Sequence, residues 1–236
     1  MEKIEVLKKI PIFGGLADTE LLPLAERAIR KSFPKDSIIV QEAEEGDSLM
    51  VIVSGQVKVV LISEDGKEII LSMLKDGDFV GEMSLFDGEP RSASVIAMKD
   101  TTILIIQRNV FLKQIEENPR IARELLSEMS RRIRRADERI GSLILLDVYG
   151  RVANYLLDLA RNDGKKVEDG ILIEKRPTQQ DIASIIGVSR ETVSRVLNDL
   201  NRRGLISMSG KSIVILGSPD MLDQDIEIAM LSKYID

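Results

Sequence analysis

The sequence contains no cysteine and no histidine among its 236 residues. The chain therefore lacks the usual ligands of a cysteine-bound iron–sulfur cluster, a histidine-bound haem or a structural zinc ion, and we expect no metal, haem or cluster. The same absence excludes thiol redox switching and argues against most catalysis by a nucleophile paired with histidine.

Aromatic residues and long apolar runs are also scarce. Aromatics make up 3% of the chain, tryptophan is absent, and no apolar run approaches the ~20 residues needed to span a membrane. The chain begins Met1-Glu2-Lys3 without the apolar core of a signal peptide. We therefore expect a cytoplasmic protein with no membrane partner, long enough for two modest domains.

The segment from 178 to 216 has the pattern of two helices joined by a tight turn and followed by a hairpin. Thr178 and Ser189 are hydroxyl residues suited to cap the two helices, and Gly187 permits the left-handed backbone that ends the first one. The buried stripe expected for the second helix consists of Val193, Val196, Leu197 and Leu200.

The outward face of this second helix carries side chains suited to base edges. Arginine can bond guanine bidentately and glutamate can accept from cytosine, each pair discriminating by about 1–3 kcal/mol. Although the net charge is −6, basic residues outnumber acidic ones between 175 and 211, and affinity for DNA depends on this local patch. A helical hairpin with a solvated charged face is the alternative. The candidate DNA-contacting residues are Thr178, Gln179, Ser189, Arg190, Glu191, Thr192, Arg195 and Lys211.

Between 33 and 107 the pattern changes to short β-rich runs separated by glycines at intervals of nine or eleven residues. Regular turn signals of this kind predict an all-β roll or barrel. Short helices are expected before it, with Asp18 as an N-cap. The clearest expected strands are 38–40, 49–53, 56–62, 68–73 and 103–107.

Residues 79–94 interrupt these strands with a glycine turn, a short helix from about Glu82, a loop and a return strand. A helix start offers unpaired N–H groups to an anion. An arginine on the facing strand adds a positively charged guanidinium that can donate two parallel hydrogen bonds. A carboxylate beside them could accept hydrogen bonds from ribose hydroxyls. These are the parts needed to hold a cyclic nucleotide, although a glutamate–arginine pair that only braces the loop is the alternative.

Residues 119–146 predict a long helix with an apolar seam whose members alternate by four and three residues, as in a coiled coil. Because one helix alone would expose this seam, we expect two copies to pair in a symmetric homodimer. A helix packed only on its own roll is the alternative. The seam consists of Ala122, Leu126, Met129, Ile133, Ala136, Ile140 and Leu143.

The segment 186–195, Ile-Gly-Val-Ser-Arg-Glu-Thr-Val-Ser-Arg, resembles the helix-turn-helix of the cyclic-AMP receptor protein and fumarate-nitrate regulator family, also called catabolite activator-like. The Gly-Glu…Arg-Ser-Ala pattern within 81–93 is similar to the phosphate-binding cassette of cyclic-nucleotide-binding domains. The resemblance covers about 16–217. It implies an α+β fold with a jelly-roll-like cyclic-nucleotide-binding β-roll (1–118), a long dimerisation helix and hinge (119–147) and a winged helix-turn-helix (148–217). The residues beyond the typical end of the family form an acidic C-terminal tail (218–236).

The resemblance implies a homodimeric transcription regulator, not an enzyme, that is controlled by a cyclic nucleotide and reads a GTGA-type palindrome through Arg190, Glu191 and Arg195. Cyclic AMP is the expected effector and cyclic GMP the alternative. Double-stranded DNA and RNA polymerase are the candidate macromolecular partners. The residues implied for the effector are Gly81, Glu82, Met83, Ser84, Arg91, Ser92, Ala93, Arg132, Ala136 and Asp137.

One departure from the family pattern concerns the pair that contacts the adenine. The best-known members have threonine and serine there, whereas this chain has Ala136 and Asp137. Alanine cannot bond the base, while the carboxylate could accept from adenine or guanine. The departure motivates a second hypothesis, a regulator that is constitutive or senses another small ligand. A third, an enzyme or its regulatory subunit, is disfavoured because no segment remains for a catalytic domain.

Overall fold

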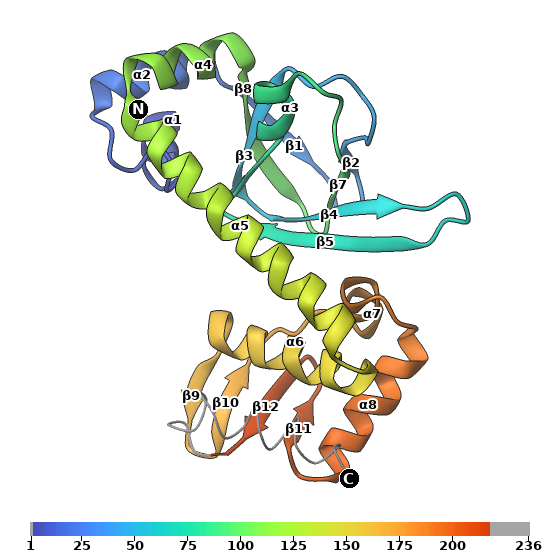
Figure 1. The fold of residues 1–236 in the computed structure, drawn as a ribbon. Helices are drawn as coiled ribbons and strands as arrows, with labels where there is room; N and C mark the ends of the chain where they lie inside the picture. The colour runs from blue at the N-terminus through green and yellow to red at the C-terminus, as the bar shows by residue number, and fades with distance from the viewer. Residues whose placement is uncertain (1, 218–236) are drawn as a thin grey trace. The chain divides into compact units, whose positions relative to one another are not determined.

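The computed structural model describes residues 2–217 and divides between Arg134 and Arg135 into two compact units (Figure 1). The predicted acidic tail, 218–236, lies outside the described residues. Across the part described, no helix is both long and apolar enough to cross a membrane.

The N-terminal unit is a β-roll made of two four-stranded antiparallel sheets, with strand orders β1-β8-β3-β6 and β2-β7-β4-β5. The expected strands are all present. The strands are β1 (Ile29–Phe33), β2 (Ile38–Val40), β3 (Ser48–Ser54), β4 (Gln56–Ile62), β5 (Glu68–Lys75), β6 (Phe79–Val80), β7 (Ser94–Ala97) and β8 (Thr101–Gln107). The helices are α1 (Glu2–Lys8), α2 (Asp18–Arg27), α3 (Glu82–Asp87), α4 (Arg108–Glu117) and the long α5 (Pro119–Leu145), of which the last turns belong to the second unit.

Strand β3 is apolar on both faces because it separates two cores. Side chains alternate along a strand, so Leu49 and Val51 join the cluster formed with the helices, whereas Met50 and Ile52 join the cluster inside the roll. The uninterrupted apolar run in the sequence therefore marks a strand covered on both sides.

One expectation for the N-terminal helices is wrong. Asp18 is the first residue of α2 and not its cap, because Ala17 holds the N-cap position. The Glu20 carboxylate accepts the Ala17 N–H at 2.6 Å, and Asp18 instead pairs with Lys8 at 2.5 Å.

The C-terminal unit is a winged helix-turn-helix around one core. Its antiparallel sheet has the strand order β11-β12-β10-β9. The elements are α6 (Val148–Asp163), β9 (Lys165–Val167), β10 (Gly170–Ile173), α7 (Gln179–Ile186), α8 (Arg190–Arg202), β11 (Ile206–Ser209) and β12 (Ser212–Leu216). The Asp147 carboxylate accepts the Gly150 N–H at 2.7 Å and caps α6. The β9–β10 hairpin was not expected.

Candidate functional site

The predicted phosphate cassette is built around a left-handed turn. Gly81 has φ +86° and ψ +9° and is the N-cap of α3, a backbone conformation that favours glycine. The next residue, Glu82, is 6% exposed and Ser84 is 2% exposed, while the Met83 side chain faces outward. The short helix therefore begins where the sequence predicts and buries its first carboxylate.

Arg91 lies within the same cassette and is only 7% exposed. Its Nη1 donates to the Gly81 carbonyl at 2.8 Å and its Nη2 to the Ser48 carbonyl at 2.9 Å. A Cβ added at Gly46 would lie 2.3 Å from Arg91 Nε, and one at Gly81 would lie 2.4 Å from Nη1. The two glycines therefore provide the space that this arginine occupies.

The charge of Arg91 fits an anionic ligand. Burial lowers the pKa of its guanidinium, while the nearby Asp47 and Glu82 carboxylates oppose this shift. Among the described residues, no carboxylate forms a direct ion pair with Arg91, and its hydrogen bonds go to neutral oxygens. A buried cation without a directly bonded counter-ion is costly, and a phosphate group would supply the missing charge.

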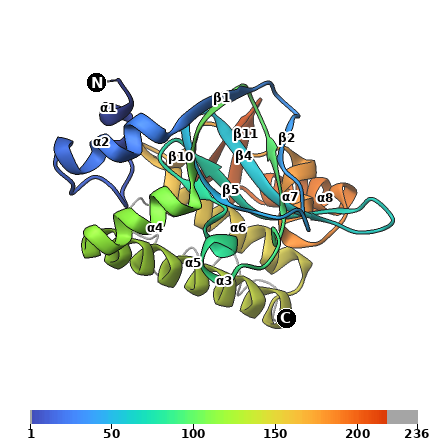
Figure 2. The same cartoon turned by 90° about the horizontal axis from the view of Figure 1, so that it is seen from above.

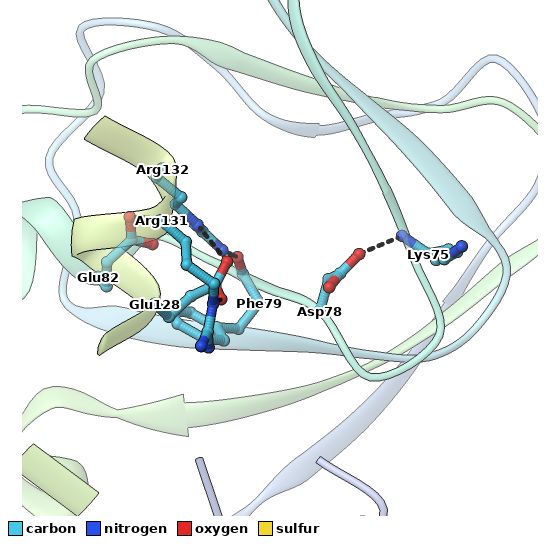
Figure 3. A network of polar contacts seen from close by, with 7 residues as sticks. All are labelled: Lys75, Asp78, Phe79, Glu82, Glu128, Arg131 and Arg132. Atoms are coloured by element: carbon cyan, nitrogen blue, oxygen red, sulfur yellow. Dashed lines mark hydrogen bonds and ion pairs between the residues drawn. The ribbon is translucent and has the colours of Figure 1, made fainter. Parts of the chain in front are cut away.

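The long helix reaches this cassette through Arg132, whose guanidinium joins three groups (Figure 3). Its Nη1 pairs with Glu82 Oε1 at 3.1 Å, its Nη2 donates to the Phe79 carbonyl at 2.8 Å, and its Nε contacts Glu128 Oε1 at 3.3 Å. The guanidinium also lies 4.6 Å from the centre of the Phe79 ring. Figure 2 shows α3 beside α5, and the Glu82–Arg132 pair joins them within the N-terminal unit.

The other predicted ligand residues are placed differently. Ser92 is exposed, with its hydroxyl 3.6 Å from the Met83 sulfur, and Ala93 is buried. Ala136 and Asp137 are exposed on α5 and belong to the second unit. The structure thus brings Gly81, Glu82, Arg91 and Arg132 together and leaves the role of Ala136 and Asp137 as a prediction.

The helix-turn-helix has the predicted caps and turn. The Thr178 hydroxyl accepts the Asp181 N–H at 3.1 Å, and the Asp181 carboxylate accepts the Thr178 N–H at 3.1 Å, forming a capping box. Gly187 ends α7 with φ +71°. The Ser189 hydroxyl accepts the Thr192 N–H at 3.2 Å and caps α8. These bonds and this glycine therefore set where α7 begins and ends and where α8 begins.

The outer face of α8 forms a shallow hollow opposite its buried stripe. The stripe consists of Val193, Val196, Leu197 and Leu200, as predicted. The hollow is lined by Arg190, Glu191, Ser194, Arg195, Asn198 and Arg202. The three candidate base-reading residues therefore share one exposed surface. Lys211 is exposed in the turn between β11 and β12, and its carbonyl accepts the Arg176 N–H at 3.0 Å, which links this wing to the segment before α7.

Two arginines outside the predicted site residues contact the end of α7. Arg139, near the end of α5, donates to the Ile185 carbonyl, and Arg151 of α6 donates to the Ile186 carbonyl at 3.2 Å. Cations at a helix C-terminus are favourable because the helix dipole is negative there. Burial lowers the pKa of Arg139. No local sequence signal indicates these contacts, since 46 and 35 residues separate the partners.

Comparison with known proteins gives two family matches on this chain. A cyclic nucleotide-binding domain matches residues 30–118, and a Crp-like helix-turn-helix domain matches residues 150–224. These matches coincide with the β-roll and with the winged helix-turn-helix described above.

Two curated relatives extend the likeness over most of the chain. The CRP-like cAMP-activated global transcriptional regulator of Mycobacterium tuberculosis is 35% identical over 214 residues, which are 91% of this chain and 96% of that protein. The cAMP-activated global transcriptional regulator CRP of Salmonella typhimurium is 42% identical over 188 residues, 79% of this chain and 89% of that protein. Among solved structures, a CooA mutant from Carboxydothermus hydrogenoformans matches with a TM-score of 0.75 at 26% identity, covering 85% of this chain and 88% of that one.

Proposed function

Because this chain belongs to the CRP family of transcription regulators, we propose that it is a homodimer that binds a GTGA-type palindrome when a cyclic nucleotide occupies the β-roll. The family consists of DNA-binding transcription regulators and not of enzymes, and the β-roll of this chain matches a cyclic nucleotide-binding domain.

Cyclic AMP is the effector that we propose, with cyclic GMP as the alternative to be tested. The M. tuberculosis and S. typhimurium relatives are named as cAMP-activated. In this chain the buried, directly uncompensated guanidinium of Arg91 carries the proposal, because it suits a phosphate. Ser92 and the start of α3 would complete the phosphate contact, and Glu82 would accept from ribose while bonded to Arg132. Ala136 and Asp137 would face the base.

The apolar seam of α5 supports a homodimer. Leu126, Ile133, Ile140 and Leu143 are 67%, 61%, 54% and 46% exposed, respectively. Large apolar side chains repeated along one helix at this exposure favour pairing with a second apolar surface, and a second copy of α5 offers the same seam in register. The alternative, packing on the same chain's roll, accounts for the half-buried Met129 but leaves these four residues uncovered.

Two copies of α8 would then read two half-sites. In dimeric helix-turn-helix proteins the recognition helices enter successive major grooves ~34 Å apart. Arg190, Glu191 and Arg195 would contact base edges. The hydroxyl, amide and lysine side chains at both helix starts and on the wing would contact the phosphate backbone. The candidate phosphate contacts are Thr178, Gln179, Ser189 and Lys211, and Thr192 is a further candidate DNA-contacting residue.

Calorimetry with cyclic AMP and cyclic GMP tests the effector assignment. We expect wild-type protein to bind cyclic AMP, Arg91→Ala to lose at least tenfold in affinity, and Arg123→Ala to bind normally, because Arg123 is an exposed arginine of α5 outside the cassette. Tighter binding of cyclic GMP would reassign the effector. No binding of either nucleotide would favour the second hypothesis, a regulator that is constitutive or senses another small ligand.

A further inference from the structure

Asn198 on the outer face of α8 has no role in the function proposed above. It lies three residues after Arg195 and seven after Glu191, which places all three on the same side of the helix. Its side chain is exposed and lines the same hollow as the candidate base-reading residues. Within the described part of the chain, no hydrogen bond engages its amide. The amide is therefore available to a partner that enters the hollow.

The chemistry of this side chain suits a base better than a phosphate. An asparagine amide presents a donor and an acceptor side by side, which match N7 and the N6 amino group of adenine in the major groove. The neighbouring basic residues are engaged differently, since Arg202 and Arg203 pair with Asp199 at 2.8 and 2.6 Å. Asn198 is thus the neutral, bidentate group at this end of the hollow.

The distance between Asn198 and Arg195 along α8 exceeds one base-pair step. A helix rises 1.5 Å per residue, so Asn198 is displaced about 4.5 Å from Arg195 along the axis. One base-pair step of DNA rises about 3.4 Å. We infer that Asn198 is a further specificity-determining residue, which reads an adenine in the base pair that flanks each GTGA half-site. This inference rests on the proposed function.

Binding to a panel of palindromic duplexes tests the inference. Each duplex keeps the GTGA half-sites and carries one of the four bases symmetrically at one flanking position, and fluorescence anisotropy gives the Kd at one salt concentration with cyclic AMP present. We expect wild-type protein to favour adenine at one flanking position by about 25- to 20,000-fold, because each symmetric duplex presents two such contacts, each worth about 5- to 150-fold. Asn198→Ala should remove this preference and leave the preference for GTGA intact.

Asn201→Ala is the matched control, because Asn201 is an exposed asparagine of the same helix outside the hollow. Alanine is the better helix former, so neither variant should weaken α8, and far-ultraviolet circular dichroism checks this. We expect Asn201→Ala to keep the flanking preference of the wild type.

Two results with wild-type protein would overturn the inference: no preference at either flanking position, or a preference for a base other than adenine. Two results with Asn198→Ala would also overturn it. One is the same flanking preference as the wild type, and the other is equally weakened binding to every duplex, which would indicate a phosphate contact. Failure of the proposed function gives a different result, since wild-type protein would then bind GTGA and scrambled duplexes equally.

Discussion

Replacing Gly81 with alanine should damage the nucleotide site through a steric effect. The same replacement at Gly88 serves as the control for the cost of the backbone conformation alone. Gly81 and Gly88 flank α3 and have similar left-handed backbones, with φ +86° and +74°. Alanine at either position costs about 1–2 kcal/mol in this conformation. The two positions differ in their surroundings, because nothing lies within 4 Å of a Cβ at Gly88.

A Cβ at Gly81 would lie 2.4 Å from Arg91 Nη1 and 2.8 Å from the Ser48 carbonyl oxygen. The guanidinium must then move and lose its 2.8 Å bond to the Gly81 carbonyl, a charged hydrogen bond worth about 1.5–3 kcal/mol. We therefore expect Gly81→Ala to lower the free energy of unfolding by about 2.5–5 kcal/mol and Gly88→Ala by about 1–2 kcal/mol.

Urea unfolding and calorimetric titration with cyclic AMP measure the two effects. Gly88→Ala should bind nucleotide like the wild type, whereas Gly81→Ala should bind at least tenfold more weakly because Arg91 is displaced. Equal destabilisation and equal affinity in the two variants would refute the steric argument and the assignment of Arg91 to the phosphate.

Three further changes address the seam, the cap and the base contact. Ile133→Ala should weaken the dimer by about 2–4 kcal/mol, because a symmetric interface buries this side chain from both subunits. Sedimentation at graded concentrations measures the dissociation of the dimer. An equal effect of Arg134→Ala would contradict the role of the apolar seam. Ser189→Ala should lower the free energy of unfolding by about 1 kcal/mol through loss of the α8 cap, and an unchanged urea midpoint would exclude the cap. Asp137→Ala should alter the ratio of the cyclic AMP and cyclic GMP affinities in calorimetry, and an unchanged ratio would remove Asp137 from the base site.

The elements that the sequence predicts correctly are those with local signals. Thr178, Gly187 and Ser189 act on backbone groups within three or four residues, so the helix-turn-helix follows from residue type and spacing. The β9–β10 hairpin was not predicted because β9 is short and begins with two exposed lysines, Lys165 and Lys166, which give no apolar alternation.

The contacts within the candidate site depend on residues far apart in the chain. Arg91 donates to Ser48 across 43 residues, and Arg132 pairs with Glu82 across 50. In the sequence, the regular spacing of glycines indicates only a turn at Gly46. In the structure, the absence of a side chain at Gly46 also makes room for Arg91. The residue types therefore identify candidate ligand-binding groups in the sequence. The partners of these groups can be identified only from the fold.

Binding of the full chain to a labelled GTGA palindrome, with and without cyclic AMP, tests the central claim most directly. At one salt concentration, fluorescence anisotropy should give a lower Kd with the nucleotide than without it on the palindrome, and no such gain on a scrambled duplex of equal length. The same Kd on both duplexes, with or without the nucleotide, would contradict a regulator in which the β-roll controls sequence-specific DNA binding.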